Sequence, residues 1–245
     1  GNAVFDKGMI IETSIFSFDK VTIHAPALTL TSTRLPFTLT STHMGGEIFF
    51  TFDQTQKNPV STNKIDVGLE DVYIKDLFKN DVTAQQLHLE VINPTHEHSG
   101  NFYLETTKIK SALLPMPELE EMTFSFDTSS LSNEHKDHFS WDQFQNWQEK
   151  DGPLSGYLRV KALPLKASLE GTIALNKNQE IEGAAALYIE GLDPFLDQLV
   201  QTKHLNFLAA QGYKFAFSMA SAFAKSRGVK EREDGQVPLA LSIQN

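Results

Sequence analysis

Apolar and polar residues alternate with a period of two along much of this 245-residue chain. In residues 28–40, leucine and phenylalanine alternate mainly with threonine and proline. Such alternation places apolar side chains on one face of a strand and polar side chains on the other. No helical pattern separates these runs, so they predict antiparallel sheet rather than βαβ units. Similar runs recur at Ile48–Phe52, Ile65–Leu69, Leu87–Val91, Phe102–Thr106 and Met122–Phe126.

The predicted strands are separated by residues that are typical of turns. These connectors are Gly45-Gly46, Asn58-Pro59, Asn93-Pro94 and the segment Leu114–Pro117.

A three-stranded meander is predicted over Leu154–Ala162, Ala167–Leu175 and Ile181–Glu190. Gly171 and Gly183 lie inside these strands. A phosphate-binding loop requires a helix directly after the glycine turn, whereas here strand follows strand. The glycines therefore indicate bulges, bends or close approach of backbones, and no nucleotide site is predicted.

Three helices are predicted in the second half of the chain. A short one covers residues 140–147 and places Trp141 and Trp147 on one face, where they are expected to be core anchors. A second begins with Asp193 as its N-cap and Pro194 as its first residue. A third covers residues 206–225, and the alternating run 237–243 predicts a closing strand.

Together these patterns predict one α+β, β-rich domain over residues 1–245. Residues 1–134 form its strand-rich half, and residues 135–245 contain the short helix, the meander, two helices and the closing strand. The expected architecture is a long curved antiparallel sheet with the C-terminal helical pair packed on one face.

The third predicted helix carries the candidate ligand-binding residues. Its apolar stripe has two readings: ordinary burial in the core, or the wall of a site for an apolar ligand. The stripe is formed by Leu208, Phe215, Met219 and Phe223.

Composition narrows the classes of function. The formal net charge of −10 opposes binding to the phosphate backbone, so no nucleic-acid partner is expected. The chain has no cysteine, which excludes disulfides and thiolate chemistry. No apolar run reaches the roughly 20 residues that a membrane-spanning helix needs.

Histidines provide the only candidates for metal-assisted chemistry. His96 and His98 are two residues apart, and His135 and His138 are three apart, so each pair could share a metal with acidic residues. Neither pair has the His-Glu-x-x-His spacing, and the chain lacks a Gly-x-Ser-x-Gly motif. A non-enzymatic protein without a cofactor is favoured, and a metal-assisted hydrolase is the minor alternative.

The C-terminal half resembles a known family in the order of its elements. The segment Trp141–Trp147 precedes the strands with Leu154–Leu158 and Leu169–Ile173, then Glu182-Gly183, two helices and Val237–Leu241. This order resembles a domain-of-unknown-function family of bacterial envelope proteins, mainly alphaproteobacterial, and the wider AsmA-like group. The resemblance implies a periplasmic protein that is anchored to or adjacent to the inner membrane through an N-terminal segment.

The AsmA-like resemblance also implies an apolar groove for lipids. The leading hypothesis is therefore a non-enzymatic envelope protein that holds a lipid or fatty acid between the sheet and the helix 206–225. The alternative is an envelope scaffold that binds other envelope proteins through exposed sheet edges.

Overall fold

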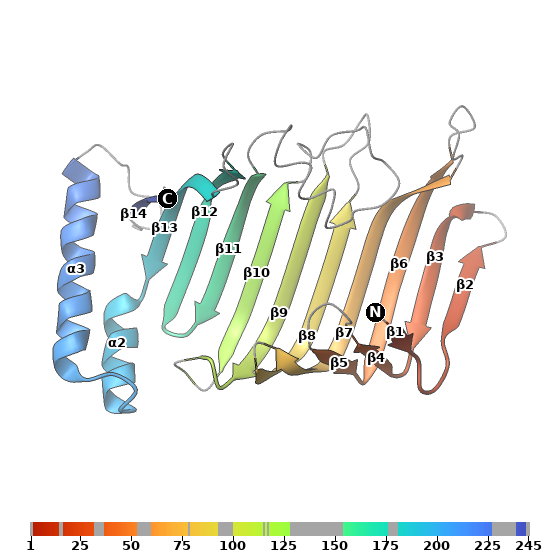
Figure 1. Ribbon diagram of the computed structural model, residues 1–245, viewed down its shortest axis with the longest axis horizontal. Helices are drawn as coiled ribbons and strands as arrows, with labels where there is room; N and C mark the ends of the chain where they lie inside the picture. The colour runs from red at the N-terminus through yellow and green to blue at the C-terminus, as the bar shows by residue number, and fades with distance from the viewer. Residues whose placement is uncertain are drawn as a thin grey trace.

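The computed structural model describes most of the chain as one antiparallel sheet followed by a pair of helices (Figure 1). Within the described residues, fourteen strands belong to this sheet, which confirms the predicted α+β, β-rich fold class. The described residues are 2–14, 17–31, 37–52, 60–77, 79–92, 100–114, 116, 118–127, 154–175, 181–226 and 239–243.

The strands follow one another across the sheet almost in chain order. The first seven are β1 (Asn2–Val4), β2 (Ile10–Ser14), β3 (Ser17–Ala25), β4 (Leu28–Thr31), β5 (Thr38–Ser41), β6 (His43–Phe52) and β7 (Val60–Leu77). The others are β8 (Asn80–Ile92), β9 (Asn101–Ser111), β10 (Leu119–Asp127), β11 (Leu154–Ala162), β12 (Leu165–Leu175), β13 (Ile181–Glu190) and β14 (Leu239–Ile243). From β7 to β14 each strand pairs with the next one along the chain, as expected for a meander.

The long strand β7 is shared by two sets of strands along one edge. Its first part pairs with β6, which leads to β3 and β2, and its last part pairs with β5, which leads to β4 and β1. The chain passes from β5 to β6 at Ser41, whose buried hydroxyl donates to the carbonyl of Glu70 over 2.7 Å. The strands β1, β4 and β5 thereby form a small branch at one end of the main strands.

This branch closes a small core against the main sheet. Leu28 on β4 is buried together with Leu69 and Val72 on β7, and Leu39 on β5 packs against them. Val72 is the largest fully buried side chain in the described part of the chain. A two-layered domain of this size buries many large apolar side chains. Because few such side chains are buried among the described residues, the described sheet is mostly a single layer.

Next to this core the regular pleat is interrupted in four neighbouring strands, β7, β8, β9 and β10. In each of them the two core residues are three positions apart rather than two, so one residue between them departs from the regular alternation. On β7 and β9 the departing residues adopt positive φ, 47° at Asp71 and 50° at Lys108. The core residues before and after each interruption therefore direct their side chains to the same face of the sheet. The paired core positions are Leu69 and Val72, Ala84 and Leu87, Thr106 and Ile109, and Leu119 and Met122.

Two helices, α2 (Leu192–Gln201) and α3 (Phe207–Ser226), lie at the β12–β14 end of the sheet (Figure 1). Helix α2 contacts β12, and α3 contacts α2 and β14. Lys214 on α3 also donates to Asp197 on α2 over 2.8 Å. The side chain of Asn206 caps α3 by accepting from the amide of Ala209 over 2.7 Å.

The predicted start of the second helix was wrong. The N-cap of α2 is Gly191 with φ of 73°, and no side chain caps the helix. A Cβ atom at Gly191 would lie 2.0 Å from the carbonyl oxygen of Pro164, so the backbone requires glycine there. Asp193 lies in the first turn instead, near the positive end of the helix dipole. Pro194 fits that turn because amides there need no helical partner.

In the described residues the strand predictions are confirmed, and two features of the sheet differ from the sequence-based expectation. Gly45-Gly46 is not a connector but lies inside β6, where a Cβ at Gly46 would meet the carbonyl of Asp66 at 2.8 Å. The strands β1, β2 and β3 were not anticipated. The predicted helix over residues 140–147 and the turns at Asn58-Pro59 and Asn93-Pro94 lie outside the described residues.

Candidate functional site

The strand register aligns apolar residues into three rows that each cross nine strands, from β3 to β13. The inner row, next to the core, is Ala25, Met44, Leu69, Leu87, Thr106, Met122, Val160, Ala167 and Ile189. The central row is Ile23, Gly46, Val67, Leu89, Leu104, Phe124, Leu158, Leu169 and Leu187. The outer row is Val21, Ile48, Ile65, Val91, Phe102, Phe126, Gly156, Gly171 and Ala185.

These three rows form what we call the apolar face. Its inner row reaches the closed core, where Leu69 is buried, and Val67 of the central row also packs against that core. In the central row Leu104 and Leu158 are only half-buried, and Phe124 is 37% exposed. The apolar face therefore keeps apolar surface accessible over much of its length. Nine strands at the usual spacing of about 4.8 Å give it a length of about 38 Å.

Aromatic side chains cluster at the middle of the apolar face. The rings of Phe102 and Phe126 stack with centroids 4.9 Å apart, and the ring of Phe124 lies 5.6 Å from that of Phe126. Next to this cluster Gly156 and Gly171 are paired in register and add no side chains. Among the described residues, the two glycines place no side chain beside the aromatic edge on the β11–β12 side.

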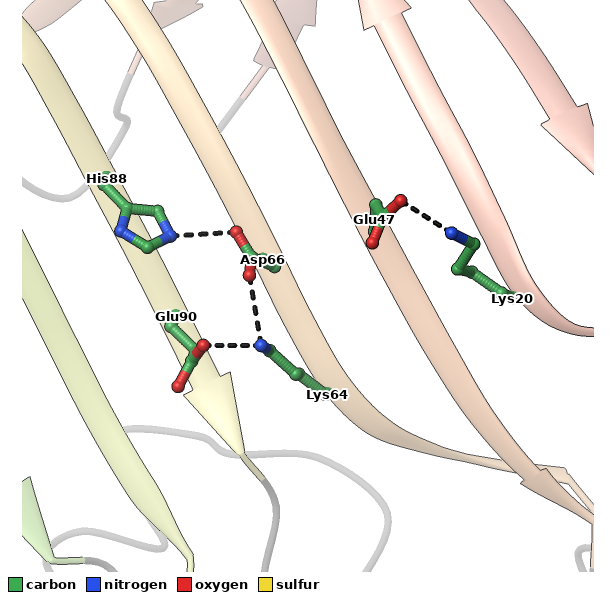
Figure 2. A network of polar contacts seen from close by, with 6 residues as sticks. All are labelled: Lys20, Glu47, Lys64, Asp66, His88 and Glu90. Carbon is green, nitrogen blue, oxygen red and sulfur yellow. Dashed lines mark hydrogen bonds and ion pairs between the residues drawn. The ribbon is translucent and has the colours of Figure 1, made fainter.

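The opposite face of the sheet is charged (Figure 2). Lys64 donates to Asp66 over 3.1 Å and to Glu90 over 2.5 Å, and Nε2 of His88 lies 2.8 Å from Asp66. The hydrogen bond to Glu90 is the main cause that raises the pKa of Lys64. Burial raises the pKa of Asp66, but hydrogen bonds with His88 and Lys64 outweigh burial and lower the net pKa.

The same polar face continues onto β9. Tyr103 donates to Glu105 over 2.6 Å, and this bond raises the pKa of Tyr103 to about 12. The partly exposed charges on this face neutralise one another across neighbouring strands, which is typical of the solvated side of a sheet.

A metal site is not formed within the described structure. In the part of the chain that the structure describes, no group of three acidic or histidine side chains could hold a metal ion. The two histidine pairs, His96 with His98 and His135 with His138, lie outside the described residues. The metal-assisted hydrolase therefore stays an untested alternative.

The structure gathers the four candidate residues of α3 into one stripe but does not place that stripe over the sheet. Leu208, Phe215, Met219 and Phe223 are between 57% and 81% exposed. The side of α3 that packs against the protein carries the buried Ala210. Positions 208 and 210 are about 200° apart around a helix, so the stripe faces away from the fold. It cannot line the apolar face of the sheet.

The apolar face was missed as a site by sequence reasoning. The sequence feature that produces this face is the alternation of apolar and polar residues, which was recognised within each single strand. Alignment of these residues into continuous rows depends on register between strands, which the alternation alone does not specify.

Comparison with protein-family models, curated proteins and solved structures gave no match. In the described part of the chain, neither helix has the length and apolar character needed to cross a bilayer.

Proposed function

We propose that this protein is a non-enzymatic cell-envelope protein that holds a lipid or fatty acid along the apolar face of its sheet. The observation that carries the proposal is the accessible central row, in which apolar residues align across nine strands. Soluble proteins rarely leave so large an apolar patch uncovered, and such patches mark binding surfaces. Acyl chains match a surface that is long and continuous and in which Thr106 is the one polar side chain of the three rows.

The aromatic cluster gives the ligand a point of attachment. Phe102, Phe124 and Phe126 provide flat apolar surface beside the two glycines, against which an extended chain can lie. Covering apolar surface stabilises the complex by roughly 25 cal/mol per Å². The ligand position differs from the sequence-based expectation, since it lies on the sheet and not against Phe215 and Phe223.

The first test is native mass spectrometry of gently purified protein, compared with a denatured sample. We expect additional mass that matches a fatty acid or phospholipid and disappears on denaturation. A bare mass near 27.4 kDa, together with no binding of added fatty acid, would contradict the proposal.

A matched pair of variants locates the ligand. Phe124→Asp places a charge in the central row, whereas Ser155→Asp places the same charge at an exposed position on the polar face of β11. Binding of cis-parinaric acid, whose fluorescence rises in apolar surroundings, should fall at least tenfold for Phe124→Asp and stay unchanged for Ser155→Asp. Phe124→Leu keeps the surface apolar and should retain binding, which separates loss of the site from loss of folding.

An envelope scaffold is a second candidate, favoured by the free edge of the sheet. Among the described strands, β2 pairs with β3 alone, and its residues Ile10 and Ile11 are exposed. Such an edge can accept a further strand from a partner. Replacing Ile11 with proline should abolish capture of envelope proteins by cross-linking while leaving fatty-acid binding unchanged.

The envelope location is supported by the resemblance to the AsmA-like group. Fractionation of cells that express the full-length protein tests it: we expect the protein in the periplasmic and inner-membrane fractions. Recovery in the cytosol would contradict this part of the proposal.

A further inference from the structure

Helix α3 is apolar on the side that faces away from the protein. Its outward stripe consists of Leu208, Phe215, Met219 and Phe223, while Lys214 and Ser221 lie toward its packed side. In an ordinary surface helix the apolar stripe faces the core and the polar side faces water. The reversed arrangement exposes a stripe that requires a cover.

The size of this stripe argues against another protein as its cover. A helix of 20 residues is about 30 Å long, and one side of it is about 10 Å wide, so the stripe offers roughly 300 Å². Stable protein interfaces bury about 800 Å² on each partner. A second copy of this chain, paired through α3, would fall well below that area.

The charge of α3 argues for a lipid bilayer. Although the chain has 31 acidic residues and a net charge of −10, none of these acidic residues lies within α3. Its charged residues are Lys214 and Lys225. Membrane surfaces with anionic lipids repel an acidic protein, so an exposed apolar helix without acidic residues can approach them more readily than the acidic parts of the chain.

The position of α3 permits such an approach. In Figure 1 the helix is the outermost element at the β13–β14 end, beyond all strands of the sheet. A flat surface can therefore meet the outward stripe without meeting the sheet. The helix would lie in the plane of the interface, as amphipathic helices do, with its apolar side chains among the lipid headgroups and upper acyl chains.

We propose that the outward stripe of α3 docks this protein on a lipid bilayer, so that one end of the apolar face lies next to the membrane. This inference deepens the proposed function and rests on it for one point, the membrane as source or recipient of the ligand. Docking itself is independent of whether the sheet holds a ligand.

The test is flotation of the full chain with vesicles of phosphatidylcholine and phosphatidylglycerol. Phe215→Asp with Met219→Asp introduces two charges into the stripe. Ala216→Asp with Ala220→Asp is the matched control: the same charges, the same spacing of four, and exposed positions about 100° around the same helix. We expect the first pair to lower the vesicle-bound fraction at least tenfold and the second pair to change it less than twofold.

Three results would overturn the docking proposal. They are a wild-type chain that does not float with vesicles, a stripe variant that floats as well as wild type, and a doubled mass in light scattering that the stripe variant alone abolishes. Circular dichroism confirms that both variants fold. Vesicle binding by a protein that shows a bare mass in native mass spectrometry and binds no added fatty acid would instead refute the proposed function and leave docking intact.

Discussion

Gly171 occupies a position at which the backbone of β13 leaves no room for a side chain. A Cβ atom there would lie 2.4 Å from the carbonyl oxygen of Ala184 and 2.7 Å from Cα of Ala185. Neither atom can move without shifting the strand. The sequence-based interpretation of Gly171 as a site of close backbone approach is thus confirmed, and the same crowding exists at Gly156, its partner in register.

We expect Gly171→Ala to lower the free energy of unfolding by about 1–3 kcal/mol, as overpacking usually does. Gly68→Ala is the control, since among the described atoms its new Cβ would have one neighbour within 4 Å, the carbonyl oxygen of Gly45 at 3.9 Å. The free energy of unfolding of Gly68→Ala should be unchanged or higher by about 0.5–1 kcal/mol, because glycine inside a strand is less stable than alanine. Urea denaturation measures both, and equal stability of the two variants would contradict the steric argument.

The polar face makes a pH-dependent contribution to stability through Asp66. Its pKa in the folded protein is below the ordinary 3.8, so its contribution is present above that pH and is lost as the pH falls through the folded pKa. Asp66→Asn removes this contribution. Between about pH 5 and about pH 3, wild type should lose about 0.2–1 kcal/mol more stability than the variant. Parallel urea titrations of wild type and variant would show an identical pH dependence if the interaction were inert.

At the scale of elements, the strands with long alternation and the helices with clear apolar stripes could be predicted. The strand β2 carries little alternation, because its sequence Ile10–Ser14 begins with two isoleucines, and β1 has only three residues. The start of α2 could not be predicted, because Pro164, which requires glycine at position 191, is distant in sequence. The outward direction of the α3 stripe is equally a tertiary property, since the pattern alone is the same for a buried helix.

Helix α3 depends on its cap more than a buried helix does, because the side chains along one side of it are mostly exposed. Asn206→Ala removes the hydrogen bond from the amide of Ala209 and should lower the stability of α3 against local unfolding by about 0.5–2 kcal/mol. Hydrogen exchange of α3 amides should accelerate, while amides of β7–β9 stay unchanged. Asn206→Asp keeps an accepting oxygen and should exchange like wild type. Faster exchange throughout the sheet in Asn206→Ala would show that α3 does not open independently.

At the scale of the whole molecule, the sheet separates two kinds of surface: charged pairs on one face and accessible apolar rows on the other. A ligand that covers the apolar face binds the folded state alone and must raise its stability. At a fatty-acid concentration of about 100 times Kd the gain is about 2.7 kcal/mol. For a chain of this length, that gain corresponds to an increase in Tm of roughly 5–11 °C.

We expect this increase for wild type and Ser155→Asp, and its absence for Phe124→Asp. Differential scanning calorimetry with and without oleate measures it. An equal increase in Tm for Phe124→Asp would place the ligand elsewhere on the molecule.

In the described sheet, each strand from β8 to β13 pairs only with its neighbours along the chain. In such a sheet each strand interacts only with the two beside it, so adding or removing a hairpin changes the free energy of pairing only at the two strands that flank it. Duplication of one hairpin would extend the apolar face by about 10 Å while every other pairing stays as it is. The length of this surface is therefore a property that evolution can change in steps of two strands, without redesign of the core, the helices or the branch at β7.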